Sequence, residues 1–501
     1  MLKFVGAVWK NFSIGVFRHF VQISFRRNKQ KIDNFAKSVG EPNGILSAKF
    51  TLALLCRTII YANILANAHT FCRKVLLYPL QTFYGGDMIT QSKPKVLVTY
   101  IESGFGHIMS AKAIASSLKA RYADKIDIVE AEIMQDDHDQ TLINFEKFLT
   151  NQTKATNKFW HYGDLVFAIM NLGKTQFMKL VHHTLFQKAV NSAVEAFHIR
   201  KPDVIISTHY FITFCAMEYK RKYCGENDVV VVSYNPDNNV HVWWDKRSDI
   251  FITNNSRAST EAIRKRKFDY SHIRQVYFTA REEVKNFNLT KQQCREKYGI
   301  PQDKFCIMIA DGGYAGGKAK RYCEWIMKHT QKPLTILFLA GKNKALYEKF
   351  CAAVPKMRSN VTLIPFEFTE KAYELYAAAD LFVTKAGPNS ILDSLFVGTP
   401  IMVDNCPHPI ERATYRLFVK SYGCGVGAFN RYKASRLIDK YAANPSLLDE
   451  FKANIAKNVD KNKDGAVQIA DIVYEQLKDK IEAQNTKADS ATDNCGVGKT
   501  E

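Results

Sequence analysis

Short runs of apolar residues recur through the middle of the chain, separated by stretches with the spacing of amphipathic helices. In the first half these runs are residues 96–100, 126–129, 204–206 and 229–232. They are rich in β-branched residues and apolar on both faces, which is typical of strands buried in a parallel sheet. Strands that alternate with helices in this way predict a doubly wound α/β domain.

The same alternation starts again near residue 305. Further runs lie at residues 305–309, 335–339, 361–364, 381–383 and 401–403. They predict a second Rossmann-like domain, and a polar, charged stretch at 282–304 separates it from the first. We therefore divide the 501 residues into an N-terminal helical arm (1–92), a first Rossmann-like domain (93–290), a second one (291–482) and a patternless polar tail that we expect to be disordered (483–501).

Charge changes the interpretation of the arm. The chain has a net charge of +21, and residues 1–95 carry 14 Lys and Arg against three acidic residues. Near the N-terminus, apolar and aromatic residues recur at helical spacing and would share one face of a helix, with Lys and Arg on the other. Arg57 interrupts the apolar segment 51–66, so an interfacial helix is favoured over a spanning one. We expect a peripheral protein on an anionic membrane, with the alternative that the arm packs on the protein itself. No nucleic-acid partner is expected, because no binding motif accompanies the charge.

The 11 cysteines are scattered singly, without metal-ligand spacing. The first residues do not resemble a secretory signal. We therefore expect reduced thiols in a cytosolic setting. The expected location is therefore the cytosolic face of a membrane.

Three glycine-containing turns follow predicted strands. In the first, Gly104 and Gly106 precede His107 at the start of a helix. The glycines permit a tight turn and close approach of a ligand, and the helix start offers free N–H groups. The alternative is an ordinary glycine turn with an incidental histidine.

The second turn, residues 310–317, has four glycines in six residues, among them Gly312 and Gly313. It is not a P-loop, because Lys318-Ala319 follows the last glycine. A phosphate-binding loop and a merely flexible loop both remain open.

The third turn is the most specific. Lys385, Ala386, Gly387 and Pro388 follow a strand and open a helix that contains Asp393. A helix N-terminus can hold a diphosphate through its N–H groups, and a carboxylate one to two turns later can accept hydrogen bonds from ribose hydroxyls.

With these motifs in this order, residues 94–430 resemble the family 28 glycosyltransferases, and within them the monogalactosyldiacylglycerol synthases and processive diacylglycerol glucosyltransferases. The residues that carry the resemblance are the turn 104–107, Pro-Asp-Val-Ile-Ile-Ser-Thr-His at 202–209, Gly-Lys-Asn at 341–343, Thr-Lys-Ala-Gly-Pro at 384–388 and Gly-Cys-Gly at 423–425.

The resemblance implies a GT-B fold, in which the first domain faces the acceptor and the second binds the UDP-sugar. It makes His107 the catalytic base, and it implies donor-binding roles for a set that comprises Gly104, Gly106, Gly312, Gly313, Lys385, Ala386, Gly387, Pro388, Asp393 and Glu411. Asp393 stands where the family usually has Glu. Ile410 replaces the Gln of a Gln-Glu pair that contacts the sugar, which leaves the sugar open. Asp311 stands where a small residue is common.

The resemblance further implies inverting transfer of a hexose from UDP-galactose or UDP-glucose to diacylglycerol. No cofactor and no tightly bound metal are expected. The sequence 234–237 and Trp243-Trp244 are candidates to shape the acceptor side, with plain packing as the alternative. Two other functions remain open: transfer of N-acetylglucosamine to a lipid-linked precursor, and an inactive lipid-bound scaffold of the same fold.

Overall fold

A computed structural model describes residues 93–101, 105–133, 139–158, 181–184, 186–225, 227–313, 318–406 and 408–482. The predicted membrane arm (1–92) and the predicted disordered tail (483–501) lie outside these residues, so both stay predictions. Among the helices that are described, none has the length and apolar character needed to cross a membrane.

Six parallel strands form the first sheet, in the order β2-β1-β3-β4-β5-β6. All four predicted strands are present within a few residues of their expected positions. Two strands were not predicted: β5 is a four-residue run between polar neighbours, and β6 has only three residues and is mostly exposed. The bounds are β1 (Lys95–Thr99), β2 (Asp127–Ala131), β3 (Val204–Ser207), β4 (Val230–Asn235), β5 (Ile250–Thr253) and β6 (Ile273–Gln275).

A second parallel sheet has the order β12-β11-β10-β7-β8-β9. All five predicted strands are present, and the extra strand β12 is a Gly-Val-Gly segment that no apolar run marks. The bounds are β7 (Phe305–Ala310), β8 (Leu334–Leu339), β9 (Val361–Phe366), β10 (Leu381–Lys385), β11 (Ile401–Asn405) and β12 (Gly425–Gly427).

Helices connect the strands, because parallel neighbours need a crossover connection. Their bounds are α3 (Phe105–Tyr122), α5 (Gln140–Lys158), α8 (Gln187–Arg200), α9 (Tyr210–Tyr223), α10 (Ser256–Arg264), α11 (Glu282–Lys285), α12 (Lys291–Lys297), α13 (Ala319–His329), α14 (Lys344–Cys351), α15 (Ala372–Ala378), α16 (Pro388–Phe396), α17 (Pro409–Tyr415), α18 (Arg431–Ala443), α19 (Asp449–Asn458) and α20 (Gly465–Glu475). The shorter segments are η1 (Tyr270–His272), η2 (Val354–Lys356), η3 (Arg416–Ser421, a π-helix) and η4 (Pro445–Leu448).

The apolar runs form strands because burial on both faces of the sheet stabilises them. Every residue of β7 and β8 is buried, and separate apolar clusters cover the two faces of the second sheet. Each fully buried Leu, Ile or Phe side chain contributes about 1.5–3 kcal/mol. The central strands are therefore rigid supports for the loops at their carboxyl ends.

The strand order of each sheet reverses at one point. In the first sheet the chain goes from β1 outward to β2 and then returns to β3 on the other side of β1. In the second it goes from β7 outward to β9 and returns to β10 beside β7. Ligands of open α/β sheets bind beyond the carboxyl ends of the strands at such reversals. The loops after β1, β3, β7 and β10 are therefore the expected site.

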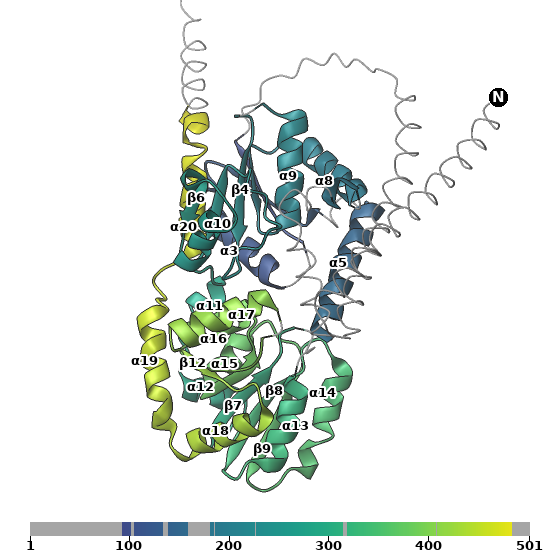
Figure 1. The fold of residues 1–501 in the computed structure, drawn as a ribbon. Coiled ribbons are helices and arrows are strands. Elements are labelled where there is room, and N and C mark those ends of the chain that lie inside the picture. Colours follow the sequence, from purple (N-terminus) through teal and green to yellow (C-terminus); the bar gives the residue numbers. More distant parts are fainter. Residues whose placement is uncertain are drawn as a thin grey trace, which may run out of the picture. The chain divides into compact units, whose positions relative to one another are not determined.

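The chain crosses between the sheets at places that differ from the predicted division. Phe278 and Val284 belong to the core of the second sheet, although the boundary was predicted near residue 290. Helix α20, drawn in yellow beside α3, buries Ile469 and Val473 in the core of the first sheet, although residues up to 482 were assigned to the second domain (Figure 1). An amphipathic helix pattern does not state which sheet its apolar face covers, so the sequence alone misplaced it.

Candidate active site

The strand ends at the two reversals carry most of the predicted site residues. His107 follows β1, and His209 follows β3, its neighbour in the sheet. Gly312 and Gly313 follow β7, and Lys385 ends the neighbouring strand β10. Because parallel neighbours end at the same edge, each pair of loops is brought together.

The first and third predicted motifs also touch each other. Gly106, in the first turn of α3, lies against Asn389 of α16, so that a Cβ at Gly106 would stand 3.3 Å from Asn389 Nδ2. Nearby, Asn238 Nδ2 donates a hydrogen bond to Thr414 Oγ1 over 3.1 Å. The histidine turn and the helix after the Lys-Ala-Gly-Pro loop are therefore parts of one site. Gly104 lies outside the described residues.

His107 is held by the backbone of the loop after β3. Its Nδ1 lies 2.5 Å from the carbonyl oxygen of Thr208, and Thr208 Oγ1 donates to the carbonyl of His107 over 3.0 Å. A carbonyl oxygen only accepts, so Nδ1 carries the proton and Nε2 carries the lone pair. Burial lowers the pKa of His107, and the hydrogen bond to Thr208 opposes this only in part. The ring is therefore neutral near pH 7, with Nε2 able to accept a proton.

Aromatic rings line the first sheet's side of the site. The ring of His209 meets that of His107 edge to face, with centroids 4.9 Å apart. Tyr210 then lies 5.3 Å from His241 and 5.0 Å from Trp243, between ring centroids. A surface of this kind excludes water and has a low dielectric constant.

The ionisable groups of this side shift toward their neutral forms. Burial, followed by the neighbouring His107, lowers the pKa of His241 to about 3. Burial raises the pKa of Asp237 to about 7.

Of the two tryptophans predicted to shape the acceptor side, Trp243 lies beside Tyr210. Trp244 packs in the core against Phe251, which is the alternative that the sequence analysis left open.

The glycine loop after β7 is braced by the loop after β8. Gly312 has φ of +70° and Gly341 φ of +60°, values that favour glycine. Gly341 approaches Gly313 so closely that a Cβ would stand 2.5 Å from the Gly313 carbonyl oxygen. That oxygen also accepts a hydrogen bond from the N–H of Lys342 over 2.8 Å. Backbone contact therefore requires glycine at 341, and residues 314–317 lie outside the described part of the loop.

Asp311, which departs from the family pattern, connects the two loops that are predicted to bind the donor. Its buried carboxylate accepts the N–H of Ala319, at the start of α13, over 2.6 Å, and the N–H of Lys385 over 3.3 Å. Burial raises the pKa of Asp311, and these N–H groups oppose the shift. The carboxylate thus satisfies the free N–H groups that the two loops present.

Two of the predicted donor residues form an ion pair. Lys385 Nζ lies 2.9 Å from Glu411 Oε1, and the side chains are 21% and 6% exposed. Burial lowers the pKa of Lys385, but Glu411, together with Asp311 and Asp404, outweighs it, so that the pKa is raised. The ammonium therefore stays charged inside the site.

The residues between Lys385 and α16 shape the backbone rather than supply side-chain chemistry. Ala386 is fully buried and its N–H donates to the carbonyl of Asn405 over 2.9 Å. Gly387 caps α16, and Pro388 is its first residue, where a missing N–H costs nothing. The Lys385 side chain passes 3.9 Å from the position of a Cβ at Gly387, an ordinary van der Waals distance, so space alone does not require glycine here.

Asp404 was missed by the sequence analysis. It lies near the end of β11, is fully buried, and neither of its carboxylate oxygens has a hydrogen-bond partner among the described residues. Burial raises its pKa well above the ordinary value, and the neighbouring Asp311 adds to the shift. The signal available in the sequence was an acidic residue placed directly after the apolar run 401–403.

Asp393, the predicted ribose-binding carboxylate, lies in the second turn of α16 and is mostly buried. Its Oδ2 accepts a hydrogen bond from Arg281 Nη2 over 2.8 Å. Burial raises the pKa of Asp393, and Arg281 opposes the shift. The sequence analysis did not single out Arg281, because it lies 112 positions away along the chain.

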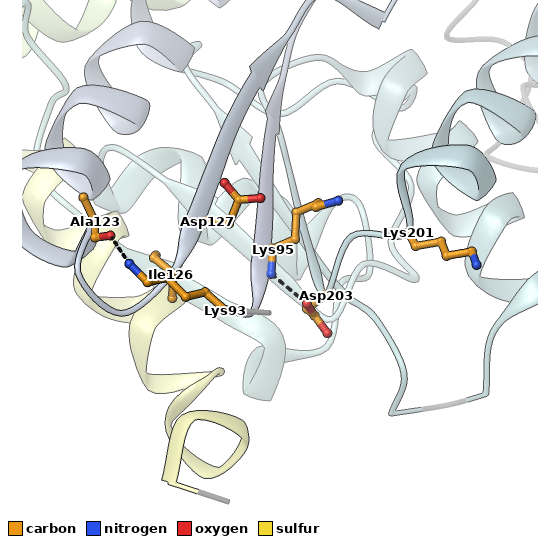
Figure 2. Close-up of a pocket in the computed structure, with 7 residues that line it drawn as sticks. All are labelled: Lys93, Lys95, Ala123, Ile126, Asp127, Lys201 and Asp203. Atoms are coloured by element: carbon orange, nitrogen blue, oxygen red, sulfur yellow. Dashed lines mark hydrogen bonds between the residues drawn. The ribbon is translucent and has the colours of Figure 1, made fainter. Parts of the chain in front are cut away.

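A separate pocket of about 580 Å³ opens at the opposite edge of the first sheet, where β1, β2 and β3 begin (Figure 2). Three lysines and two aspartates line it, but much of this charge is already engaged. Lys93 Nζ donates to the carbonyl of Ala123, and Asp203 accepts from the N–H of Lys95 and from Lys480. The pocket lies where these strands begin, away from the carboxyl ends that carry the predicted site residues.

Residues 321–412 match the model of the glycosyltransferase family 28 C-terminal domain, a range that includes Lys385, Asp393 and Glu411. The chain is 21% identical over 387 residues to monogalactosyldiacylglycerol synthase 2, chloroplastic, of Arabidopsis thaliana, covering 72% of this chain and 77% of that protein. It is 24% identical over 284 residues to the processive diacylglycerol beta-glucosyltransferase of Bacillus licheniformis, covering 54% of this chain and 69% of that protein.

Among solved structures, MurG of Acinetobacter baumannii aligns with 76% of this chain and 99% of its own, at 13% identity and a TM-score of 0.49. Two parallel-sheet α/β domains, loops gathered at the reversals of strand order and the match to the family model agree with one another. The chain is a glycosyltransferase whose residues 321–412 match the family 28 C-terminal domain, and it is similar in sequence to a monogalactosyldiacylglycerol synthase and a processive diacylglycerol glucosyltransferase.

Proposed function

We propose that this enzyme transfers a hexose from UDP-galactose or UDP-glucose to diacylglycerol at a membrane surface, with inversion, in a GT-B arrangement of its two domains. The observation that carries the proposal is the contact between the His107 turn and helix α16 through Gly106 and Asn389. It joins a base with a free lone pair to a helix N-terminus suited to a diphosphate. The acceptor is proposed from the names of the relatives.

In the proposed reaction, Nε2 of His107 takes the proton of the acceptor hydroxyl. The hydroxyl oxygen forms a bond to the anomeric carbon, and the bond from that carbon to the diphosphate oxygen breaks. UDP leaves with the bonding electron pair. Because His107 is neutral and its Nδ1–H donates to the carbonyl of Thr208, Nε2 is the nitrogen that can accept the proton. Such a base contributes about 10²–10⁴ in rate.

On the donor side, we propose that the N–H groups at the start of α16 and the Lys385 ammonium stabilise the diphosphate as it leaves. Asp393 would accept the ribose hydroxyls. Glu411, which now pairs with Lys385, would be released to the sugar when the diphosphate attracts that lysine. This exchange supplies positive potential from the protein itself, and we keep the expectation that no tightly bound metal is needed.

The arm at residues 1–92 is proposed to hold the enzyme on anionic lipid. Each cation near an anionic leaflet contributes about 1 kcal/mol, and the attraction weakens as salt shortens the Debye length. Binding of the full chain to liposomes should therefore require anionic lipid and fall with rising salt. Salt-independent binding would mean that apolar insertion holds the arm instead.

The function is tested by incubating the purified protein with anionic liposomes that contain diacylglycerol. UDP-galactose, UDP-glucose and UDP-N-acetylglucosamine are supplied separately, and the lipids are analysed by mass spectrometry. Hexosyl-diacylglycerol from either hexose donor would establish the function and name the sugar. Binding of UDP without any product would point to another acceptor, and absence of UDP binding would favour an inactive scaffold.

A further inference from the structure

Arg281 is held in the second domain by three contacts. Its Nη2 donates to Asp393 Oδ2 over 2.8 Å, and its Nη1 donates to the carbonyl of Glu370 over 2.8 Å. The guanidinium also lies over the ring of Tyr373, 5.4 Å from its centroid. The side chain is only 19% exposed, so its position is set by the protein rather than by solvent.

The backbone that carries Arg281 is anchored as well. Two residues earlier, Thr279 Oγ1 lies 3.2 Å from both Ser110 Oγ and the Tyr234 hydroxyl of the first domain. Phe278 packs in the core of the second sheet. The residue that holds Asp393 therefore stands on a fixed segment where the chain passes between the two domains.

We infer that Arg281 is a positioning residue for the nucleotide: it holds the Asp393 carboxylate through Oδ2 and leaves Oδ1 to accept the ribose hydroxyls. The inference rests on the proposed role of Asp393. Only one carboxylate oxygen is engaged by the arginine, and a carboxylate has about four acceptor positions. Asp is one methylene shorter than the Glu usual at this position, so its orientation matters more.

Electrostatics gives Arg281 a second effect on the same carboxylate. Among the described residues, the charged or titratable groups that act on Asp393 are Arg281, Glu283 and the phenol of Tyr376. Burial and Glu283 disfavour the ionised carboxylate, and Arg281 is the cation that opposes them. Without Arg281, the pKa of Asp393 rises further, and a protonated carboxyl accepts hydrogen bonds poorly.

The test is UDP binding to the full chain, measured by calorimetry between pH 5 and pH 8. Arg281→Gln is expected to weaken binding about 10- to 100-fold at the acid end, the range for a hydrogen bond to a charged group. The loss should shrink as pH rises, because the carboxyl then ionises without help. Arg281→Lys, which keeps a cation, should retain the wild-type pH profile.

Two variants complete the test. Asp393→Asn should bind UDP weakly at every pH, because its amide does not titrate. Arg295→Gln removes a similar 2.8 Å ion pair, to Asp380 of the same domain, and should leave the pH profile of UDP binding unchanged. If Arg281→Gln matches the wild type, or weakens binding equally at every pH, the inference is wrong. If the wild type binds no UDP, the proposed function fails instead.

Discussion

The two halves of the site differ in how many of their buried groups are ionised. On the first sheet's side, burial pushes His107, His241 and Asp237 toward their uncharged forms among aromatic rings. On the second sheet's side, two ionised pairs are kept, Lys385 with Glu411 and Arg281 with Asp393, although burial raises the pKa of the neighbouring Asp404 well above its ordinary value. A base must be neutral to accept a proton, whereas a diphosphate and a ribose need charged partners. The contrast therefore matches a division between proton transfer and donor binding.

The contrast between the two halves is tested most directly by removing the proposed base, His107. His107→Ala should reduce transfer about 10²–10⁴-fold, because general-base catalysis supplies that range. UDP binding should be unchanged, since the donor loops belong to the second sheet. Initial rates and calorimetric UDP binding measure the two effects separately. Joint loss of transfer and UDP binding would mean that His107 is structural.

Removing the cation on the other side should give a different pattern. Lys385→Met leaves the buried Glu411 carboxylate without its cationic partner, so the free energy of unfolding should fall by about 3–5 kcal/mol, and donor affinity should fall with it. The double variant Lys385→Met/Glu411→Gln should recover stability but not donor affinity. Denaturant unfolding and UDP titration check this. Recovery of affinity in the double variant would show that Lys385 acts only on Glu411.

The glycine loop can be tested with a matched pair of substitutions. Gly341→Ala adds a Cβ 2.5 Å from the Gly313 carbonyl oxygen at a φ of +60°, whereas Gly398→Ala has a φ of +82° but nothing within 4 Å. Both should incur backbone strain of about 1–3 kcal/mol, but only Gly341→Ala should also raise the KM for the donor. Steady-state kinetics and thermal unfolding distinguish them. Equal KM values would separate the loop from donor binding.

The neutral histidine predicts a pH profile. Because burial lowers the pKa of His107 from its ordinary value of 6.5, the acid limb of kcat/KM should have its midpoint below 6.5. Activity is lost as pH falls through that pKa, since the protonated ring cannot accept a proton. Rates measured from pH 4.5 to 8 on wild type supply the midpoint. A midpoint above 6.5 would contradict a neutral, buried base.

The smallest effect is expected from metal removal. We propose that Lys385 and the start of α16 supply the positive potential that the diphosphate needs. Transfer should therefore be unchanged after treatment with EDTA. Loss of activity that magnesium restores would show that the second half of the site needs a further cation.

Local pattern was sufficient for much of the fold and for part of the site. The apolar runs predicted nine of the twelve strands that the structure describes, and the glycine turns located His107, Gly312 and Lys385 at strand ends. The pattern failed at β5, a run of four residues, and at β6 and β12, where three residues carry no periodic signal. It also failed at α20, because an amphipathic stripe shows that a helix is buried but not against which sheet.

The sequence by itself determined two α/β domains and three glycine turns, because burial and turn conformation act over a few neighbouring residues. Only the tertiary structure decided that Arg281 meets Asp393, that Lys385 meets Glu411, and that Asp404 lies buried beside them. These partners stand up to 112 positions apart. Their meeting depends on strand order and on the way the chain crosses between the sheets, which no local window of residues encodes.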